Sequence, residues 1–243
     1  MKVLDLFSGI GGFSLGLERA GMETIAFCEF DKHAQKVLKK HWPDIPIHDD
    51  VRTLDGTQYR GTVDVVCGGF PCQDLSQAGK QAGFDGERSS LYTEMLRIIS
   101  ECLPRYAIFE NVTSLLSGEQ GRWFAKFLYD LAKIGFDAEW HCISASEFGK
   151  AHHRDRVWII AYPNGTVSQG LEFQKPLCSY SEESRRREYT RAIDAAIPAD
   201  DYARDRPNID GVSEIMEQLK QYGNAVIPQI PEAIGRAIMQ CEL

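Results

Sequence analysis

Short apolar runs alternate with helical patterns along most of this 243-residue chain, and this alternation constrains the fold more than any other feature. Runs rich in Val, Ile and Phe are typical of buried strands, and they lie at residues 2–7, 24–30, 63–69, 106–112 and 156–162. Helical patterns separate them at residues 11–21, 31–42, 89–103 and 121–135. Strands and helices in this order predict an α/β fold with a mostly parallel sheet and helices on both faces.

The composition excludes several classes of protein. The chain is 43% hydrophobic with charges of both signs, which is typical of a soluble globular protein. Its start meets an acidic residue at position 5, so we expect neither a signal peptide nor an anchor, and no stretch approaches the roughly 18 apolar residues of a membrane span. Seven cysteines without C-x-x-C pairs predict no disulfide framework, no structural zinc and a cytoplasmic location.

The region 163–216 differs from the rest of the chain. It is polar, broken by Pro and Gly and without clear periodicity, so it reads as an insertion. A helix is expected after Pro228 or Pro231. We therefore predict one domain formed by residues 1–162 and 217–243, interrupted by the insertion.

The first strands end in residues suited to an adenosine-containing cofactor. The loop after strand 2–7 contains glycines that let the backbone approach a ligand at a helix N-terminus, namely Gly9, Gly11 and Gly12. About 20 residues further on, Glu29 could hold a ribose hydroxyl pair, and we prefer it to Asp31. Asp50 could accept a hydrogen bond from an adenine amine. Taken singly, each of these residues could instead belong to an ordinary turn, a helix cap or the solvated surface.

A lone cysteine stands out in "GGFPCQDLS", residues 68–76. Cys72 lies on a turn at the end of a predicted strand, whereas four other cysteines lie in apolar runs and are expected in the core: Cys28, Cys67, Cys102 and Cys142. Glu110 ends the next strand, so a thiol and a carboxyl group would face one crevice. Arg154 and Arg156 precede the last strand and could balance the charge.

These motifs together resemble those of the DNA cytosine-5 methyltransferases. The resemblance covers residues 1–162 and about 217–243, and its motifs, in order, are "DLFSGIGG", "CEFD", "DDV", "GGFPCQDLS", "ENV", "HRDRVWIIA" and "YGNAV". Pro-Cys-Gln followed some 40 residues later by Glu-Asn-Val is highly specific. The resemblance implies a Rossmann-like, S-adenosylmethionine-dependent methyltransferase that acts on double-stranded DNA, flips the target base out of the helix and needs no metal.

The resemblance also implies a role for each matching residue. Cys72 would attack carbon 6 of cytosine, Glu110 would engage ring nitrogen 3, and Arg154 and Arg156 would support the base and the glutamate. The residues implied at the cofactor site are Phe7, Gly9, Gly11, Gly12, Glu29, Asp50 and Asn224.

Some features depart from the family pattern. Asp74-Leu75 replaces the usual Pro-Phe, and His152 replaces a Gln. The resemblance implies that the insertion 163–216 is a reduced target-recognition segment, so we expect a recognition site of two or three base pairs or reliance on an accessory partner. Residues 184–191, "SRRREYTR", could contact phosphates or form a solvated helix face. A net charge of −8 weighs against indiscriminate binding to nucleic acid.

Two other functions remain open at this stage. A related class of enzymes uses the same scaffold on transfer RNA, and a non-catalytic DNA-binding module could descend from the enzyme. The complete set of Cys72, Glu110, Arg154 and Arg156 favours an enzyme, which we expect to act as a monomer. Its place, in restriction-modification or before a later modification of the methylated base, stays open.

Overall fold

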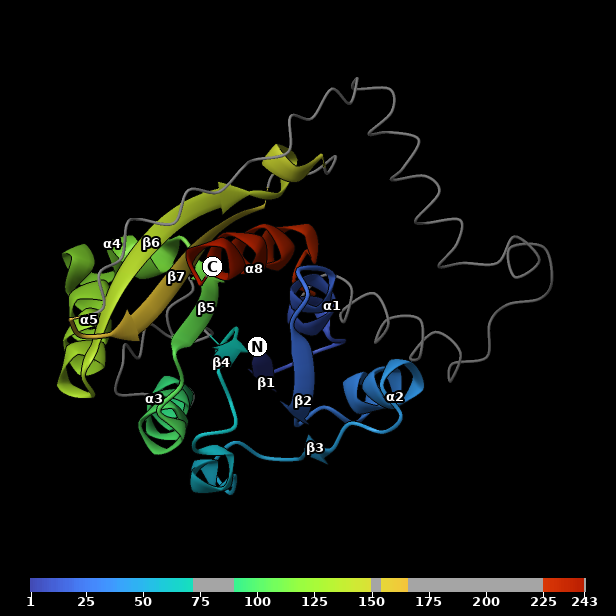
Figure 1. Ribbon diagram of the computed structural model, residues 1–243. Helices are drawn as coiled ribbons and strands as arrows, with labels where there is room; N and C mark the ends of the chain where they lie inside the picture. The colour runs from blue at the N-terminus through green and yellow to red at the C-terminus, as the bar shows by residue number, and fades with distance from the viewer. Residues whose placement is uncertain (72–89, 150–153, 166–224, 243) are drawn as a thin grey trace, which may run out of the picture.

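Seven strands of the described residues form one sheet in the order β3-β2-β1-β4-β5-β7-β6 (Figure 1). The computed structural model describes residues 1–71, 90–149, 154–165 and 225–242. The strands are β1 (Lys2–Leu6), β2 (Glu23–Cys28), β3 (Ile47–His48), β4 (Val65–Gly68), β5 (Tyr106–Val112), β6 (Phe136–Ser144) and β7 (Asp155–Pro163).

Six of the seven strands run in the same direction, and only β7 of this sheet is reversed. β1 pairs in parallel with both β2 and β4, and β5 extends this parallel set on the far side of β4. β7 then inserts antiparallel between β5 and β6. The strand order reverses between β1 and β4, and crevices at the carboxyl ends beside such a switch point are where ligands bind in this kind of sheet.

Helices cover both faces of the sheet, as the sequence predicts. The described α-helices are α1 (Gly12–Arg19), α2 (Lys32–His41), α3 (Ser90–Cys102), α4 (Ser114–Ser117), α5 (Arg122–Lys133) and α8 (Gln229–Cys241). Short 3-10 turns are η1 (Gly56–Tyr59), η3 (Gly118–Gly121) and η4 (Ala145–Phe148). α1 and α8 lie together on one side of the sheet, with α3 and α5 on the other (Figure 1).

The core has two layers because successive strand residues point to opposite faces. One layer joins α1 and α8 to the face that includes Val3, Val65 and Ile108. The other joins α3 and α5 to the opposite face, whose strand residues include Leu4, Val66 and Phe109. Both faces of the central strands are therefore buried, which explains why these strands read as continuous apolar runs.

The main difference from the sequence prediction is β6. We predicted no strand at residues 136–144, although the alternation of apolar and polar residues in "FDAEWHC" is typical of a strand with one buried face. Among the described residues β6 lies at the edge of the sheet and pairs only with β7, and most of its residues are not buried. Cys142 on this strand is exposed, and our expectation that it belongs to the core is wrong.

The C-terminal segment returns to the start of the chain. α8 begins at Gln229, after Pro228 as predicted, and packs on α1. Because α1 follows the glycine loop, this packing brings residues 225–228 next to the carboxyl ends of the central strands. Among the described residues, no helix combines the length and the apolar character that crossing a bilayer requires.

Candidate active site

The loop after β1 and the end of β2 are joined through Glu29. The backbone N–H of Gly9 donates to Glu29 Oε2 and that of Asp31 donates to Oε1, each at 2.7 Å. Burial raises the pKa of Glu29, and these two N–H groups oppose that effect. A carboxylate has about four acceptor positions, so Glu29 keeps capacity for further donors such as vicinal hydroxyls. Asp31 instead caps α2, accepting from the N–H groups of His33 and Ala34.

The three glycines of the loop have different surroundings. Gly9 has φ 54°, and nothing lies within 4 Å of the Cβ that another residue would place there. A Cβ at Gly11 would lie 2.6 Å from the Trp42 ring, and one at Gly12 would lie 2.4 Å from the carbonyl oxygen of Val226. Of the three, only Gly9 borders open space, whereas Gly11 and Gly12 also allow protein segments to pack closely.

Two aromatic residues flank this part of the site. Phe7 has φ 53°, an unusual value for a residue with a side chain, and it directs the chain into the glycine loop. Phe30 follows Glu29 and is 72% exposed. Sequence reasoning missed Phe30, although an aromatic residue directly after a candidate ribose-binding acid could have been noticed as a surface on which a base can stack.

Asp50 lies in the loop after β3, where its carboxylate is engaged by Arg52. The Arg52 guanidinium contacts both carboxylate oxygens, the shorter distance being 2.6 Å from Nη2 to Oδ2. These hydrogen bonds hold the pKa of Asp50 below its usual value. The residue is therefore ionised at neutral pH and is only partly buried. A ligand amine would share this carboxylate with Arg52.

Glu110 lies at the other side of the switch point between two arginines. It is near the end of β5 with its side chain 12% exposed, and Arg156 Nε lies 3.0 Å from Oε1 while Arg154 Nη2 lies 4.0 Å away. Burial raises the pKa of Glu110, and the charges of Arg156 and Arg154 act in the opposite direction. The Glu110 carboxyl group is thus shielded from water and lies close to two positive charges.

The segment that leads to Cys72 runs beside Glu110. Gly69 is so close that a Cβ there would lie 3.1 Å from Glu110 Oε2. Phe70 is buried and packs against Tyr92 and Phe127. The buried Asn111 amide donates to the Phe70 carbonyl oxygen at 3.2 Å. These contacts fix the chain up to Pro71, the residue before Cys72.

Arg154 also connects Glu110 to the C-terminal segment. Its Nη1 donates to the carbonyl oxygen of Ala225 at 2.7 Å. The next residue, Val226, has its carbonyl oxygen against Gly12 of α1. The glycine loop, Arg154 and Glu110 are thus linked through two residues of the C-terminal segment, Ala225 and Val226.

Several predicted residues cannot be placed. Cys72, Asn224, Asp74-Leu75 and His152 lie outside the described residues, as do residues 184–191. The described cysteines Cys28, Cys67 and Cys102 are buried, and burial is the main cause that raises the pKa of each thiol, so they are core residues as predicted. Within the described ranges, no group of three or more His, Cys, Asp or Glu could hold a metal ion.

A sheet with this switch point, a glycine loop after β1 and an acid at the end of β2 is typical of Rossmann-like, cofactor-binding α/β proteins. A buried acid flanked by arginines near its carboxyl edge adds a candidate reaction centre. Comparison of the sequence with known families narrows this class. The chain belongs to the C-5 cytosine-specific DNA methylase family, whose model matches residues 1–205.

Similar curated proteins support the same family assignment. The chain is 38% identical over 176 residues to the type II methyltransferase M.Eco47II of Escherichia coli, a match that covers 72% of this chain and 42% of the relative. It is 31% identical over 176 residues to M.HhaI of Haemophilus parahaemolyticus, covering 72% and 53%. The chain thus spans about half the length of the curated relatives it matches.

Solved structures share the fold. A prophage-encoded protein of E. coli, assigned as a DNA modification methyltransferase, has a TM-score of 0.57 at 28% identity over 67% of this chain and 47% of its own. A DNMT2 variant of Spodoptera frugiperda has a TM-score of 0.58 at 22% identity, over 70% and 52%. The α/β fold with a mostly parallel sheet is therefore confirmed.

Proposed function

We propose that this chain transfers a methyl group from S-adenosylmethionine to carbon 5 of cytosine in double-stranded DNA. The observation that supports this most directly is the position of Glu110. It is buried between Arg154 and Arg156 and beside the segment that ends at Cys72. A carboxyl group beside the residues that precede Cys72 in the sequence supports a reaction in which the two groups act on one pyrimidine ring.

The reaction requires both groups because carbon 5 of cytosine is a poor nucleophile. In the proposed mechanism the Cys72 thiolate forms a bond to carbon 6, and Glu110 gives a proton to nitrogen 3 as electron density moves to carbon 5. The bound cofactor supplies the methyl group from its sulfonium. Carbon 5 then loses its proton to a base, nitrogen 3 returns its proton, and Cys72 leaves as the thiolate.

The arginines serve two purposes in this mechanism. Arg156 lies close enough to orient the Glu110 carboxyl group, and its charge limits how far burial raises the Glu110 pKa. Arg154 is itself held by the Ala225 carbonyl, so its position depends on the C-terminal segment. Both also offer donors to the carbonyl oxygen of the base.

The residues at the ends of β1 and β2 fit an adenosine-containing cofactor. Glu29 has acceptor capacity left for the ribose hydroxyls, Gly9 borders open space, and the exposed Phe30 ring offers a stacking surface for adenine. Asp50 would accept a hydrogen bond from the adenine amine while it remains hydrogen-bonded to Arg52. Phe7, Gly11, Gly12 and Asn224 complete the proposed set, the two glycines chiefly by allowing close packing of the loop.

The proposed division of the chain follows the same logic. Residues 1–162 and 217–243 would form the catalytic domain, since β7 ends at Pro163 and α8 packs back onto α1. Residues 163–216 would recognise the target, alone or with an accessory partner. A monomeric state and a cytoplasmic location stay predictions.

Methyl transfer to nucleic acid tests the proposal. Purified protein with labelled S-adenosylmethionine is given unmodified duplex DNA or transfer RNA in parallel, and the product base is identified by mass spectrometry. Cys72→Ala is the test variant, and Cys142→Ala is the matched control because Cys142 is an exposed cysteine on the edge strand β6. We expect 5-methylcytosine in DNA from the wild type and from Cys142→Ala, and none from Cys72→Ala.

A trapping experiment tests the covalent step. DNA that contains 5-fluorocytosine has no proton to lose from carbon 5, so the adduct with Cys72 should persist as a complex stable to denaturation. Transfer only to RNA would reassign the substrate. Methylation that survives in Cys72→Ala would contradict the mechanism.

A further inference from the structure

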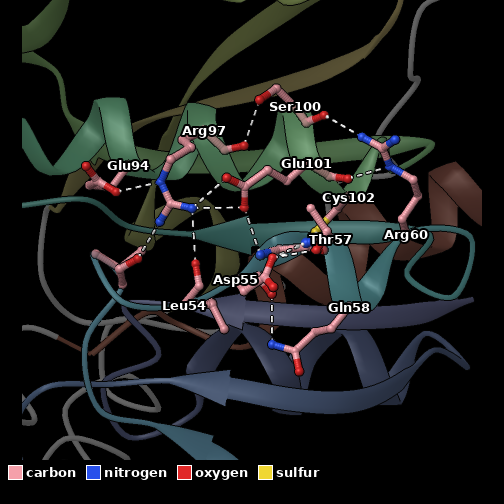
Figure 2. A network of polar contacts seen from close by, with 12 residues as sticks. Leu54, Asp55, Thr57, Gln58, Arg60, Glu94, Arg97, Ser100, Glu101 and Cys102 are labelled. Atoms are coloured by element: carbon pink, nitrogen blue, oxygen red, sulfur yellow. Dashed lines mark hydrogen bonds and ion pairs between the residues drawn. The ribbon is translucent and has the colours of Figure 1, made fainter.

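A network of polar contacts ties the loop after β3 to α3 (Figure 2). Arg97 of α3 is at its centre. Its Nη2 donates to the carbonyl oxygen of Val51 at 2.9 Å, and its Nη1 donates to that of Leu54 at 3.1 Å. The same guanidinium pairs with Glu94 at 2.8 Å and with Glu101 at 2.7 Å. One side chain thus holds two backbone carbonyls of a loop about 45 residues away in sequence.

The loop that Arg97 holds contains Asp50. Asp50 forms a tight turn in which its carbonyl oxygen accepts from the Thr53 N–H at 3.1 Å and its carboxylate accepts from the Arg52 N–H at 3.0 Å. These contacts shape the turn but do not anchor it to the sheet. Before the turn, the Asp49 carboxylate accepts from Gln35 and Lys32 of α2. After it, the anchors are the buried side chains of Val51 and Leu54 and the two carbonyl groups held by Arg97.

We propose that Arg97 is a positioning residue for the cofactor site, which holds the Asp50 turn where its carboxylate can meet the adenine of S-adenosylmethionine. This inference rests on the proposed function. The Val51 carbonyl belongs to the residue directly after Asp50, so a shift of this anchor should move the Asp50 carboxylate as well. The planar guanidinium suits the task because its donors form a rigid fork, which a lysine ammonium lacks.

A second arginine joins the same two elements farther from Asp50. Arg60 Nε donates to the carbonyl oxygen of Glu101 at 2.8 Å, near the C-terminal end of α3. Glu101 in turn accepts from the Gly56 N–H at 2.8 Å. Arg60 therefore stabilises the contact between loop and helix without holding the Asp50 turn, and it is the matched control.

The test compares Arg97→Met with Arg60→Met. Cofactor affinity is measured by titration calorimetry with S-adenosylmethionine, stability by urea unfolding, and chemistry by single-turnover methyl transfer at saturating cofactor. We expect both variants to lose stability. Arg97→Met should raise the Kd about tenfold, the equivalent of one hydrogen bond to a charged group, while Arg60→Met stays within about twofold. The rate at saturating cofactor should change little in either variant.

A second variant distinguishes a local effect on cofactor affinity from a loss of folding. Arg97→Lys keeps the positive charge next to Glu94 and Glu101 but cannot donate to both carbonyls in the same way. It should remain folded and show a similar loss of affinity. Equal affinity in the wild type and both Arg97 variants would overturn the inference, and so would an equal loss in Arg60→Met. A wild type that does not bind S-adenosylmethionine would instead overturn the proposed function, and the inference with it.

Discussion

Gly12→Ala should damage the reaction centre from within the cofactor loop. The added Cβ would lie 2.4 Å from the Val226 carbonyl oxygen and 3.0 Å from Val226 Cβ. Ordinary contact of a methyl group begins near 3.4 Å. The Val226 backbone must therefore move by roughly 1 Å, because no change of rotamer can relieve a contact with a carbonyl group.

The displacement should reach Arg154 through Ala225. A shift of about 1 Å would break the hydrogen bond from Arg154 to Ala225, which is 2.7 Å long. Overpacking of this kind costs about 1–3 kcal/mol, and loss of one hydrogen bond to a charged group costs about 1.5 kcal/mol. Because alanine favours the helix over glycine by up to about 1 kcal/mol, we expect the free energy of unfolding to fall by about 1.5–3.5 kcal/mol. The methyl-transfer rate at saturating cofactor should fall roughly tenfold.

Urea unfolding and single-turnover methyl transfer measure these two effects. Leu15→Ala is the control on the same helix, because Leu15 is 37% exposed. It should change neither quantity by more than about 0.5 kcal/mol or twofold. Adding Val226→Ala to Gly12→Ala should not restore the rate, since the carbonyl oxygen and Cβ both remain. A Gly12→Ala protein with wild-type stability and rate would refute the reasoning.

Three further predictions concern single side chains. Burial raises the pKa of Glu110, so its protonated form persists to higher pH than in an exposed glutamate, and the methyl-transfer rate should fall as pH rises through this pKa. Glu110→Gln should lower the rate by about 10² or more and remove this fall from the pH-rate profile. Burial raises the pKa of Asp5 from 3.8 to about 7, so its contribution to stability is complete below about pH 4 and is lost as pH rises to about 7. Over this range the free energy of unfolding of the wild type should fall by up to about 4 kcal/mol relative to that of Asp5→Asn. The same pH dependence of the unfolding free energy in both proteins, measured with urea, would contradict this. Phe30→Ala should weaken S-adenosylmethionine binding about tenfold in calorimetry with a change in unfolding free energy under about 0.5 kcal/mol, and an unchanged Kd would exclude stacking.

The positions of the central strands and of most helices could be predicted from the sequence because local patterns determine them. Buried parallel strands such as β4 must be apolar on both faces, and α5 shows a helical apolar stripe whose buried members include Phe124, Phe127 and Leu131. Glu110 could likewise be expected at a strand end, and it lies there near the end of β5. The order of the motifs along the chain indicated the family, which no single residue could do.

Other features depend on which segments meet in space. The alternating residues of β6 are a local strand signal, but its place beside β7 depends on pairing with a segment farther along the chain. The close packing at Gly12 depends on Val226, over 200 positions later in the chain, and no local pattern announces such a contact. The same is true of Arg97, which reads locally as a helix residue paired with Glu94 and Glu101.

The reactive groups of this protein could be identified from the sequence, because a thiol, a carboxyl group and two arginines near the ends of predicted strands can be recognised without a structure. The environment of these groups could not be identified in this way. Burial of Glu110 and its distances to Arg154 and Arg156 follow from long-range packing, whereas the pairing of Asp50 with Arg52 is local. Since burial and nearby charge set the pKa of each group, the tertiary structure alone decides how these groups can act.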